Sequence, residues 1–242
     1  MKFAQIEQYV SLSSIYLERR FHFVSFKETD IINIVIAGTA GQGVITLKRL
    51  IEFAAQRANV ERNFGSEMHG LAQREGAIMS HTRYQKKIYE DERKNIQSSL
   101  ICYGEADLYI CLEPAEALRR GIFASSKTSF VINERDIPGV MYTAALEDYP
   151  SLEKISEILR GYSNDFFFMN ATELSLNNFN SNQYVNLIML GFAITTGKLP
   201  FIEIEHYEEV IKEWLRDADS NTKALHLGFE KGEQIIRSSK FD

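Results

Sequence analysis

The spacing of the apolar residues changes near residue 40. Residues 31–37 form a short, nearly continuous run of β-branched and other apolar side chains, which is typical of a strand buried on both faces. Between residues 44 and 58 the apolar side chains recur every three or four positions, which predicts a helix with one buried face. A strand, a glycine-rich turn and a helix in this order predict the opening of a doubly wound sheet.

The alternation of apolar runs and helical patterns continues toward the C-terminus. Further strands are predicted at 106–112, 129–133 and 165–170, and helices at 114–120 and 151–160. Residues 78–84 and 87–89 predict an inserted β-hairpin, and the last third contains helices at 184–195, 204–215 and 221–237. The predicted fold is therefore α/β: a Rossmann-like, open, mostly parallel sheet with helices on both faces, an inserted β-hairpin and a helical C-terminal part.

Length and composition limit the class of protein. The chain has 242 residues, 45% hydrophobic and 25% charged, and we divide it into an N-terminal extension at residues 1–30 and one domain at residues 31–242. The 27 basic and 33 acidic side chains give a net charge of 27 − 33 = −6, which disfavours a nucleic-acid partner. No apolar stretch approaches the roughly 20 residues of a membrane span, so no membrane partner is expected.

The chain has two cysteines, Cys102 and Cys111. So few thiols favour a reducing compartment, and we expect a cytoplasmic protein. Two cysteines cannot build an iron–sulfur cluster within this chain, because such a cluster takes about four ligands.

The turn after the first strand, Gly38-x-Ala40-x-x-Gly43, is a dinucleotide-binding fingerprint with alanine at its second position. Glycine permits the tight turn and lets the backbone approach a phosphate at the start of the following helix. The candidate cofactor-binding residues are Gly38, Thr39, Gly41, Gln42 and Gly43. The alternative is a tight strand-to-helix turn that binds no ligand.

A nicotinamide dinucleotide site would need an acidic residue about 20 positions later, at the end of the second strand. Glu61 is near that position, but it lies inside the run 60–64 rather than at its end. Arg62 beside it would suit the 2′-phosphate of NADP. A free-standing NAD(P)-binding oxidoreductase therefore stays open as an alternative.

A second polar segment, residues 65–77, contains side chains that are poor core material. Those suited to recognising a carboxylate, a phosphate or a partner's backbone are Ser66, Glu67, His69, Gln73 and Arg74. The chain lacks a G-x-S-x-G elbow, which disfavours a serine hydrolase. The spacing of His69 and His81 fits no usual zinc pattern, so no metal site is expected.

Four stretches together resemble one family: residues 38–43 (GTAGQG), 66–74 (SEMHGLAQR), 104–107 (GEAD) and 112–119 (LEPAEALR). They are similar to the gamma-type subunit of 2-oxoacid:ferredoxin oxidoreductases, and most of all to the beta subunit of indolepyruvate ferredoxin oxidoreductase. The resemblance runs from about residue 31 to 232. Ala40 and Glu75 depart from it, since glycine is usual at both positions, and residues 1–30 have no counterpart.

The resemblance implies a role in the oxidative decarboxylation of a 2-oxoacid, with electrons passing to ferredoxin and the acyl group to coenzyme A. It implies that thiamine diphosphate, Mg and iron–sulfur clusters lie on a larger partner subunit, and that this chain is inactive alone. The turn and the second segment are then expected near the carboxyl ends of neighbouring strands, facing the partner or the coenzyme A path. A scaffold or binding protein that retains the fold is the remaining alternative.

Overall fold

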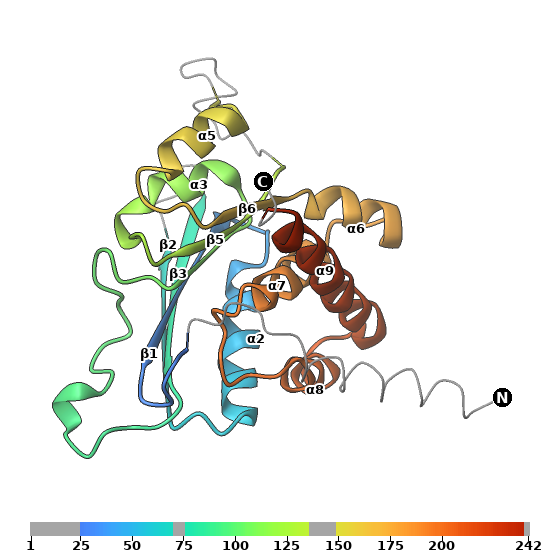
Figure 1. Cartoon of the computed structure of the whole chain (residues 1–242). Helices are drawn as coiled ribbons and strands as arrows, with labels where there is room; N and C mark the ends of the chain where they lie inside the picture. Colours follow the sequence, from blue (N-terminus) through green and yellow to red (C-terminus); the bar gives the residue numbers. More distant parts are fainter. Residues whose placement is uncertain (1–24, 70–75, 136–148, 240–242) are drawn as a thin grey trace.

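The computed structural model describes residues 25–69, 76–135 and 149–239 (Figure 1). Most of the predicted N-terminal extension and the candidates Gln73 and Arg74 lie outside these residues.

A six-stranded sheet in the order β2-β3-β1-β4-β5-β6 forms the centre of the molecule (Figure 1). Its strands are β1 (Ile31–Thr39), β2 (Arg62–His69), β3 (Ala77–Gln85), β4 (Leu108–Cys111), β5 (Ser129–Asn133) and β6 (Phe166–Met169). The pairs β1–β4, β4–β5 and β5–β6 are parallel, whereas β3 pairs antiparallel with both β1 and β2. Only β3 therefore runs against the other strands, and the predicted mostly parallel sheet is confirmed.

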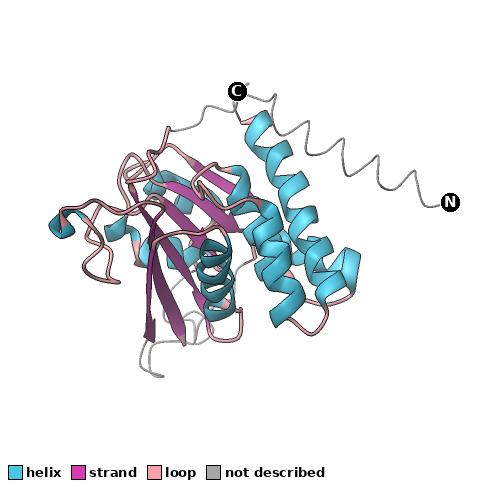
Figure 2. Cartoon of the chain, turned by 90° about the horizontal axis from the view of Figure 1, so that it is seen from below, coloured by secondary structure: helices cyan, strands magenta, loops and turns pink. Residues whose placement is uncertain are grey.

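Helices cover both faces of the sheet, as predicted (Figures 1 and 2). They are α2 (Val44–Arg57), α3 (Pro114–Arg119), α5 (Leu152–Leu159), α6 (Ala171–Phe179), α7 (Val185–Thr195), α8 (Ile204–Trp214) and α9 (Ala218–Ser238), with short 3₁₀ turns η1 (Glu92–Lys94) and η2 (Gly121–Phe123). Helix α6 was not predicted, because the apolar residues among its nine positions do not form a clear helical pattern.

The inserted hairpin exists, but its predicted pairing is wrong. It is formed by β2 and β3, with Arg62 opposite Gln85 and His69 opposite Ile78, and residues 87–89 belong to no strand. Strand β2 lies at the edge of the sheet and carries several polar side chains. Polar residues are common on edge strands, and they hid this strand from the apolar pattern.

Alternate residues of the central strands enter two hydrophobic cores. Ile32, Ile34 and Ile36 of β1 pack on the side of α2, α7, α8 and α9. Val35 and Ala37 pack on the opposite side, with side chains of α3 and α5. This period of two, with both faces covered, explains why β1 reads as an unbroken apolar run.

Helix α7 lies between the sheet and α9, and nearly all of its residues are buried. It therefore shows no polar face, and only its length distinguishes it from a buried strand in the sequence. The two helices approach closely, because a Cβ placed on Gly228 of α9 would lie 1.9 Å from the carbonyl oxygen of Ile188 in α7.

Candidate functional site

The turn between β1 and α2 is held by the side chain of Gln42. Its Oε1 accepts a hydrogen bond from the N–H of Thr39 (2.7 Å), and its Nε2 donates to the carbonyl oxygen of Leu112 beyond β4 (3.0 Å). Gly38 has no room for a side chain, since a Cβ there would lie 2.6 Å from Gln42 Oε1. The Gln42 amide thus ties the turn to the next parallel strand.

A second amide binds the same carbonyl group from the other side. Asn133, at the end of β5, donates through Nδ2 to Leu112 O (3.2 Å) and to Thr172 Oγ1 in α6 (3.1 Å). The carboxyl ends of β1, β4 and β5 are therefore joined by two side-chain amides. Sequence reasoning missed Asn133, because its partners lie far away along the chain.

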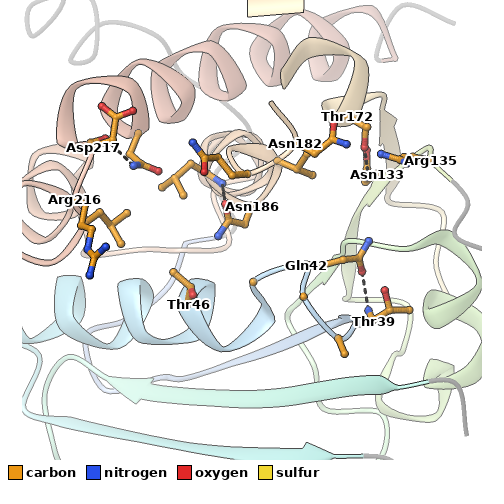
Figure 3. A pocket seen from close by; sticks show the side chains of 18 residues that line it. Thr39, Gln42, Thr46, Asn133, Arg135, Thr172, Asn182, Asn186, Arg216 and Asp217 are labelled. Carbon is orange, nitrogen blue, oxygen red and sulfur yellow. Dashed lines mark hydrogen bonds between the residues drawn. The ribbon is translucent and has the colours of Figure 1, made fainter. Parts of the chain in front are cut away.

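A pocket of about 670 Å³ opens at this edge of the sheet, between the start of α2, the start of α7 and the link from α8 to α9 (Figure 3). Of the five candidate residues in the turn, Thr39, Gly41, Gln42 and Gly43 line the pocket, whereas Gly38 is not part of its wall. The other side chains come mostly from the C-terminal helices and the link between them: Thr172, Asn182, Gln183, Asn186, Leu215, Arg216, Asp217 and Asn221. The helical C-terminal part therefore completes a site that the glycine turn begins.

The side chain of Asn186 lies close to the turn. It lies in the first turn of α7 and is only 7% exposed, and its Nδ2 would be 2.6 Å from a Cβ placed on Gly43. Gly43 is the residue before α2 and has a φ of +85°, so it is suited to glycine by its conformation as well as by this contact. The sequence contains one signal for Asn186, a lone amide within the apolar run 184–195.

Two residues of the second polar segment, Ser66 and Glu67, contact different parts of the molecule. Ser66 and Glu67 follow each other in β2 and therefore point to opposite faces of the sheet. Ser66 Oγ donates to the carbonyl oxygen of Ser99 (3.4 Å), whereas Glu67 pairs with Lys48 of α2 (3.3 Å). His69 is the last residue of β2, and Gln73 and Arg74 lie outside the described residues.

The prediction that the turn and the second segment follow neighbouring strands needs a correction, although the two segments do meet where the N–H of Ala40 donates to the carbonyl oxygen of Gly76 (2.8 Å). The carboxyl ends of β1 and β2 lie at the same edge of the sheet, but β3 separates them, so they are not neighbouring strands. Thr39 at the end of β1 pairs with Ala77 of β3, and His69 at the end of β2 pairs with Ile78 of β3. The sequence reasoning was wrong because it did not recognise β2 as half of the hairpin.

A partly buried ion cluster links α2 to β2. Lys48 Nζ lies 3.4 Å from Glu52 Oε1 and 3.3 Å from Glu67 Oε1. Burial raises the pKa of Glu52 above its ordinary value, although the ammonium group of Lys48 opposes the shift. Glu67 therefore shares one cation with Glu52, and its side chain remains 25% exposed.

The residues considered for NAD(P) are engaged elsewhere. Glu61 accepts hydrogen bonds from the N–H of Ile88 (2.8 Å) and from Lys87 Nζ (3.1 Å), and these bonds lower its pKa. Arg62 binds both carboxylate oxygens of Glu92 (2.9 and 3.1 Å). Both residues lie at or just before the start of β2. The glycine turn follows the carboxyl end of β1, at the other end of the strands.

The two cysteines of the chain are too few for an iron–sulfur cluster, which takes about four ligands. Cys102 is exposed, whereas Cys111 is buried in β4, where burial raises the pKa of its thiol. Within residues 25–69, 76–135 and 149–239, no three His, Cys, Asp or Glu side chains are grouped so as to hold a metal ion. The same residues contain no helix long and apolar enough to cross a membrane.

Comparisons with known proteins agree with the architecture. The model of the family "Pyruvate ferredoxin/flavodoxin oxidoreductase" matches residues 33–231. Indolepyruvate oxidoreductase subunit IorB of Archaeoglobus fulgidus is 35% identical over 202 residues, which is 83% of this chain and 94% of that protein. The protein of the same name from Pyrococcus horikoshii is 30% identical, over 84% of this chain and 97% of that protein.

Among solved structures, the gamma subunit of keto/oxoacid ferredoxin oxidoreductase from Geobacter sulfurreducens superimposes with a TM-score of 0.57. The alignment covers 83% of this chain and 98% of that chain at 17% sequence identity. This likeness concerns the fold, and it confirms the predicted fold class.

Proposed function

The chain belongs to the pyruvate ferredoxin/flavodoxin oxidoreductase family, and from this premise we propose that it is a subunit of a 2-oxoacid:ferredoxin oxidoreductase. The observation that carries the proposal is a match to a relative that is itself named a subunit. The match covers 94% of the length of that relative. In this role the chain supports the oxidative decarboxylation of a 2-oxoacid to an acyl-CoA in the cytoplasm.

The chemistry of the reaction belongs, in this proposal, to a larger partner subunit. Two cysteines, one of them buried in β4, cannot ligate a cluster that takes about four. Thiamine diphosphate, Mg and the iron–sulfur clusters are therefore assigned to the partner, which passes electrons to ferredoxin. This chain contributes its fold, an interface and part of the approach for coenzyme A or the 2-oxoacid.

Strand β2 and the segment after it are the proposed interface. Ser66, Glu67, His69, Gln73 and Arg74 belong to this region, at an edge of the sheet whose outer side pairs with no described strand. An edge strand offers unpaired backbone groups to another chain. The carboxyl end of β2 also lies at the end of the sheet where the pocket opens, because β1 and β2 run in the same direction. This arrangement supports a path between the partner and the pocket.

Indolepyruvate is the first 2-oxoacid to test. Two relatives that align with this chain over nearly their whole length have indolepyruvate in their names. Those names describe the relatives, and the substrate contacts of this enzyme are assigned to the partner subunit.

The free-standing NAD(P) enzyme is the weaker candidate. In a dinucleotide-binding fold, the strand beside β1 carries the acidic residue that binds the ribose. Here antiparallel β3 lies between β1 and β2, and Glu61 and Arg62 are engaged at the far edge. NADH and NADPH titrated into the purified chain are expected to produce no binding signal, and micromolar affinity would reinstate this candidate.

Purification from the native cell with an affinity tag tests the subunit role. We expect a larger chain with thiamine diphosphate and iron–sulfur clusters to co-purify, and the complex to reduce ferredoxin with indolepyruvate in the presence of coenzyme A. Pyruvate and 2-oxoglutarate serve as competing substrates. The proposal is contradicted by two results obtained together from the same cells. The tagged chain purifies alone, and an active 2-oxoacid:ferredoxin oxidoreductase purifies without this chain.

Arg74→Ala tests the interface. It is expected to reduce co-purification of the partner while the melting temperature of the chain stays unchanged. Arg49, an exposed arginine of α2, gives a matched control, because Arg49→Ala removes the same charge elsewhere. Equal co-purification of both variants and the natural chain would exclude Arg74 from the interface.

A further inference from the structure

The backbone just before β1 is fixed to the domain beside the loop that leads into α8. The carbonyl oxygens of Glu28 and Thr29 accept hydrogen bonds from residues at the end of β3 and just beyond it (2.8 and 3.0 Å). Phe26 packs against the hydrophobic core, and Nζ of Lys198, in the loop between α7 and α8, lies 6.0 Å from the centre of its ring. The rest of the N-terminal extension therefore joins the domain beside this loop.

The surface of α8 exposes a large aromatic side chain and a row of acids. Trp214, the only tryptophan of the chain, is 54% exposed, and its ring stacks on Phe53 of α2 with 4.1 Å between the ring centres. Glu205, Glu209 and Glu213 are exposed and lie four residues apart, so they form an acidic row along one side of the helix. Tryptophan is enriched at contact surfaces relative to free protein surface, so this side of α8 has the features of a contact surface.

The acids of α8 outnumber the cations near them. Residues 203–214 contain five glutamates and one lysine, which gives a net charge of 1 − 5 = −4. Arg57 of α2 is shared by Glu209 (3.6 Å) and Glu213. Glu205 forms no ion pair with a described residue. The acidic row therefore keeps negative charge that a basic segment would complement.

Residues 1–24 have the composition that complements this surface. They contain three cations and two acids, a net charge of 3 − 2 = +1, whereas the rest of the chain carries −6 − 1 = −7. Arg19 and Arg20 are adjacent, and they are surrounded by aromatic and aliphatic residues in the stretch 15–24 (IYLERRFHFV). The segment thus offers paired cations for the acidic row and apolar side chains for the exposed tryptophan.

The length of chain available is sufficient for this contact. Arg20 is five residues from Ser25, the first described residue, and an extended chain of that length spans about 17 Å. Helix α8 has 11 residues and is about 16 Å long. The paired arginines can therefore reach the acidic row from the point where the extension joins the domain.

We propose that residues 1–24 bind along α8 of the same chain, with the paired arginines against the acidic row and aromatic side chains over Trp214. The tether favours this occupant, because closing so short a loop costs less entropy than recruiting a separate molecule. The family match begins at residue 33, so the contact is additional to the shared domain. The inference concerns one chain alone and does not depend on the proposed subunit role.

Trp214 reports on the contact, because the chain has no other tryptophan. The experiment is acrylamide quenching of its fluorescence in the natural full chain and in the variant Arg19→Glu/Arg20→Glu. We expect the quenching constant of the variant to be about twofold or more higher, with emission at longer wavelength, because the described domain leaves about half of Trp214 exposed. High salt should move the natural chain toward the variant.

Two results of this measurement would overturn the proposal. In the first, Trp214 of the natural chain is quenched as strongly as in the variant, which would leave α8 free for a separate partner. In the second, protection is lost on dilution together with a change from dimer to monomer in light scattering, which would assign the surface to a second copy.

Arg93→Glu/Lys94→Glu is the matched control. It reverses the charge of two adjacent exposed cations in η1, which lies beside β2 rather than α8, since Arg62 of β2 pairs with Glu92. Its quenching should equal that of the natural chain. An increase equal to that of the N-terminal variant would show a general effect of net charge, and the assignment would be wrong.

A charge swap tests the pairing itself. Adding Glu205→Arg/Glu209→Arg to the Arg19→Glu/Arg20→Glu variant restores opposite charges on the segment and α8. We expect the quenching constant to return toward that of the natural chain, because the two pairs of substitutions are then coupled. If the swap leaves Trp214 as exposed as the N-terminal variant does, the arginines do not bind the acidic row.

Discussion

Two glycines, Gly43 and Gly228, are required for opposite reasons. Gly43 stands before α2 with a φ of +85°, and a Cβ there would meet the end of a side chain, Asn186 Nδ2, at 2.6 Å. Gly228 lies within α9, where a Cβ would meet the backbone of α7 at Ile188 O, only 1.9 Å away. Gly43 leaves space for the polar side chain of Asn186, whereas Gly228 allows the backbones of α7 and α9 to pack closely together.

The difference shows how glycines that look alike in a sequence are distinguished. Gly43 belongs to a recognisable turn pattern, so local sequence announces it. Gly228 interrupts a helix, where glycine lowers helix propensity, and only the neighbouring helix explains it. Gly43 is therefore explained by the conformation of the turn, and Gly228 by helix packing.

The largest expected effect is that of Gly228→Ala. The added methyl group cannot fit against the α7 backbone, so α9 must move away and open the core beneath it. We expect the free energy of unfolding to fall by about 3 kcal/mol or more, measured by urea denaturation. A loss below about 1 kcal/mol would show that α7 and α9 separate easily, and the contrast with Gly43 would fail.

Gly43→Ala is expected to have a smaller effect, about 2 kcal/mol, from backbone strain at positive φ together with the contact to Asn186. The double variant with Asn186→Ala separates these two causes. When Asn186 is already alanine, the contact is absent. Gly43→Ala should then lower the free energy of unfolding by about 0.5–1 kcal/mol less than it does in the natural chain. Strict additivity of the two changes would mean that Asn186 swings away freely and does not restrict the turn.

Gly41→Ala isolates backbone strain. Gly41 has a φ of +87°, but a Cβ there would meet no atom within 4 Å. We expect a loss of about 1 kcal/mol, visible as a lower melting temperature, because only the conformational penalty applies. The affinity of the complex for coenzyme A should fall more clearly than stability does, since the new methyl group lines the pocket; intact affinity would place coenzyme A away from the turn.

The smallest effect on stability is expected for Arg216→Ala. The side chain is exposed and forms no ion pair with a described residue, so the free energy of unfolding should change by less than about 0.5 kcal/mol. The affinity of the complex for coenzyme A should fall about two- to fivefold at low salt, and the difference should shrink as salt screens the charge. An effect that is independent of salt would assign Arg216 to packing instead.

The elements with a strong periodic pattern could be predicted from the amino-acid sequence alone. Strand β1, helix α2 and helix α8 were predictable because strict burial on one or both faces imposes a period that a reader can count. The glycine turn was predictable because tight turns need particular residues at particular positions. The family resemblance rested on the same local stretches, in and around Gly38 and Leu112.

Which segments contact one another could be learned only from the folded chain. The pairing of β2 with β3, the opposite directions of Ser66 and Glu67, and the position of Asn186 above Gly43 depend on contacts between residues far apart in the chain. No local period encodes such contacts, because they result from strand order and from helix packing. The glycine turn was visible in the sequence, but the pocket in front of it required the fold to bring α7 and the α8–α9 link to the same edge of the sheet.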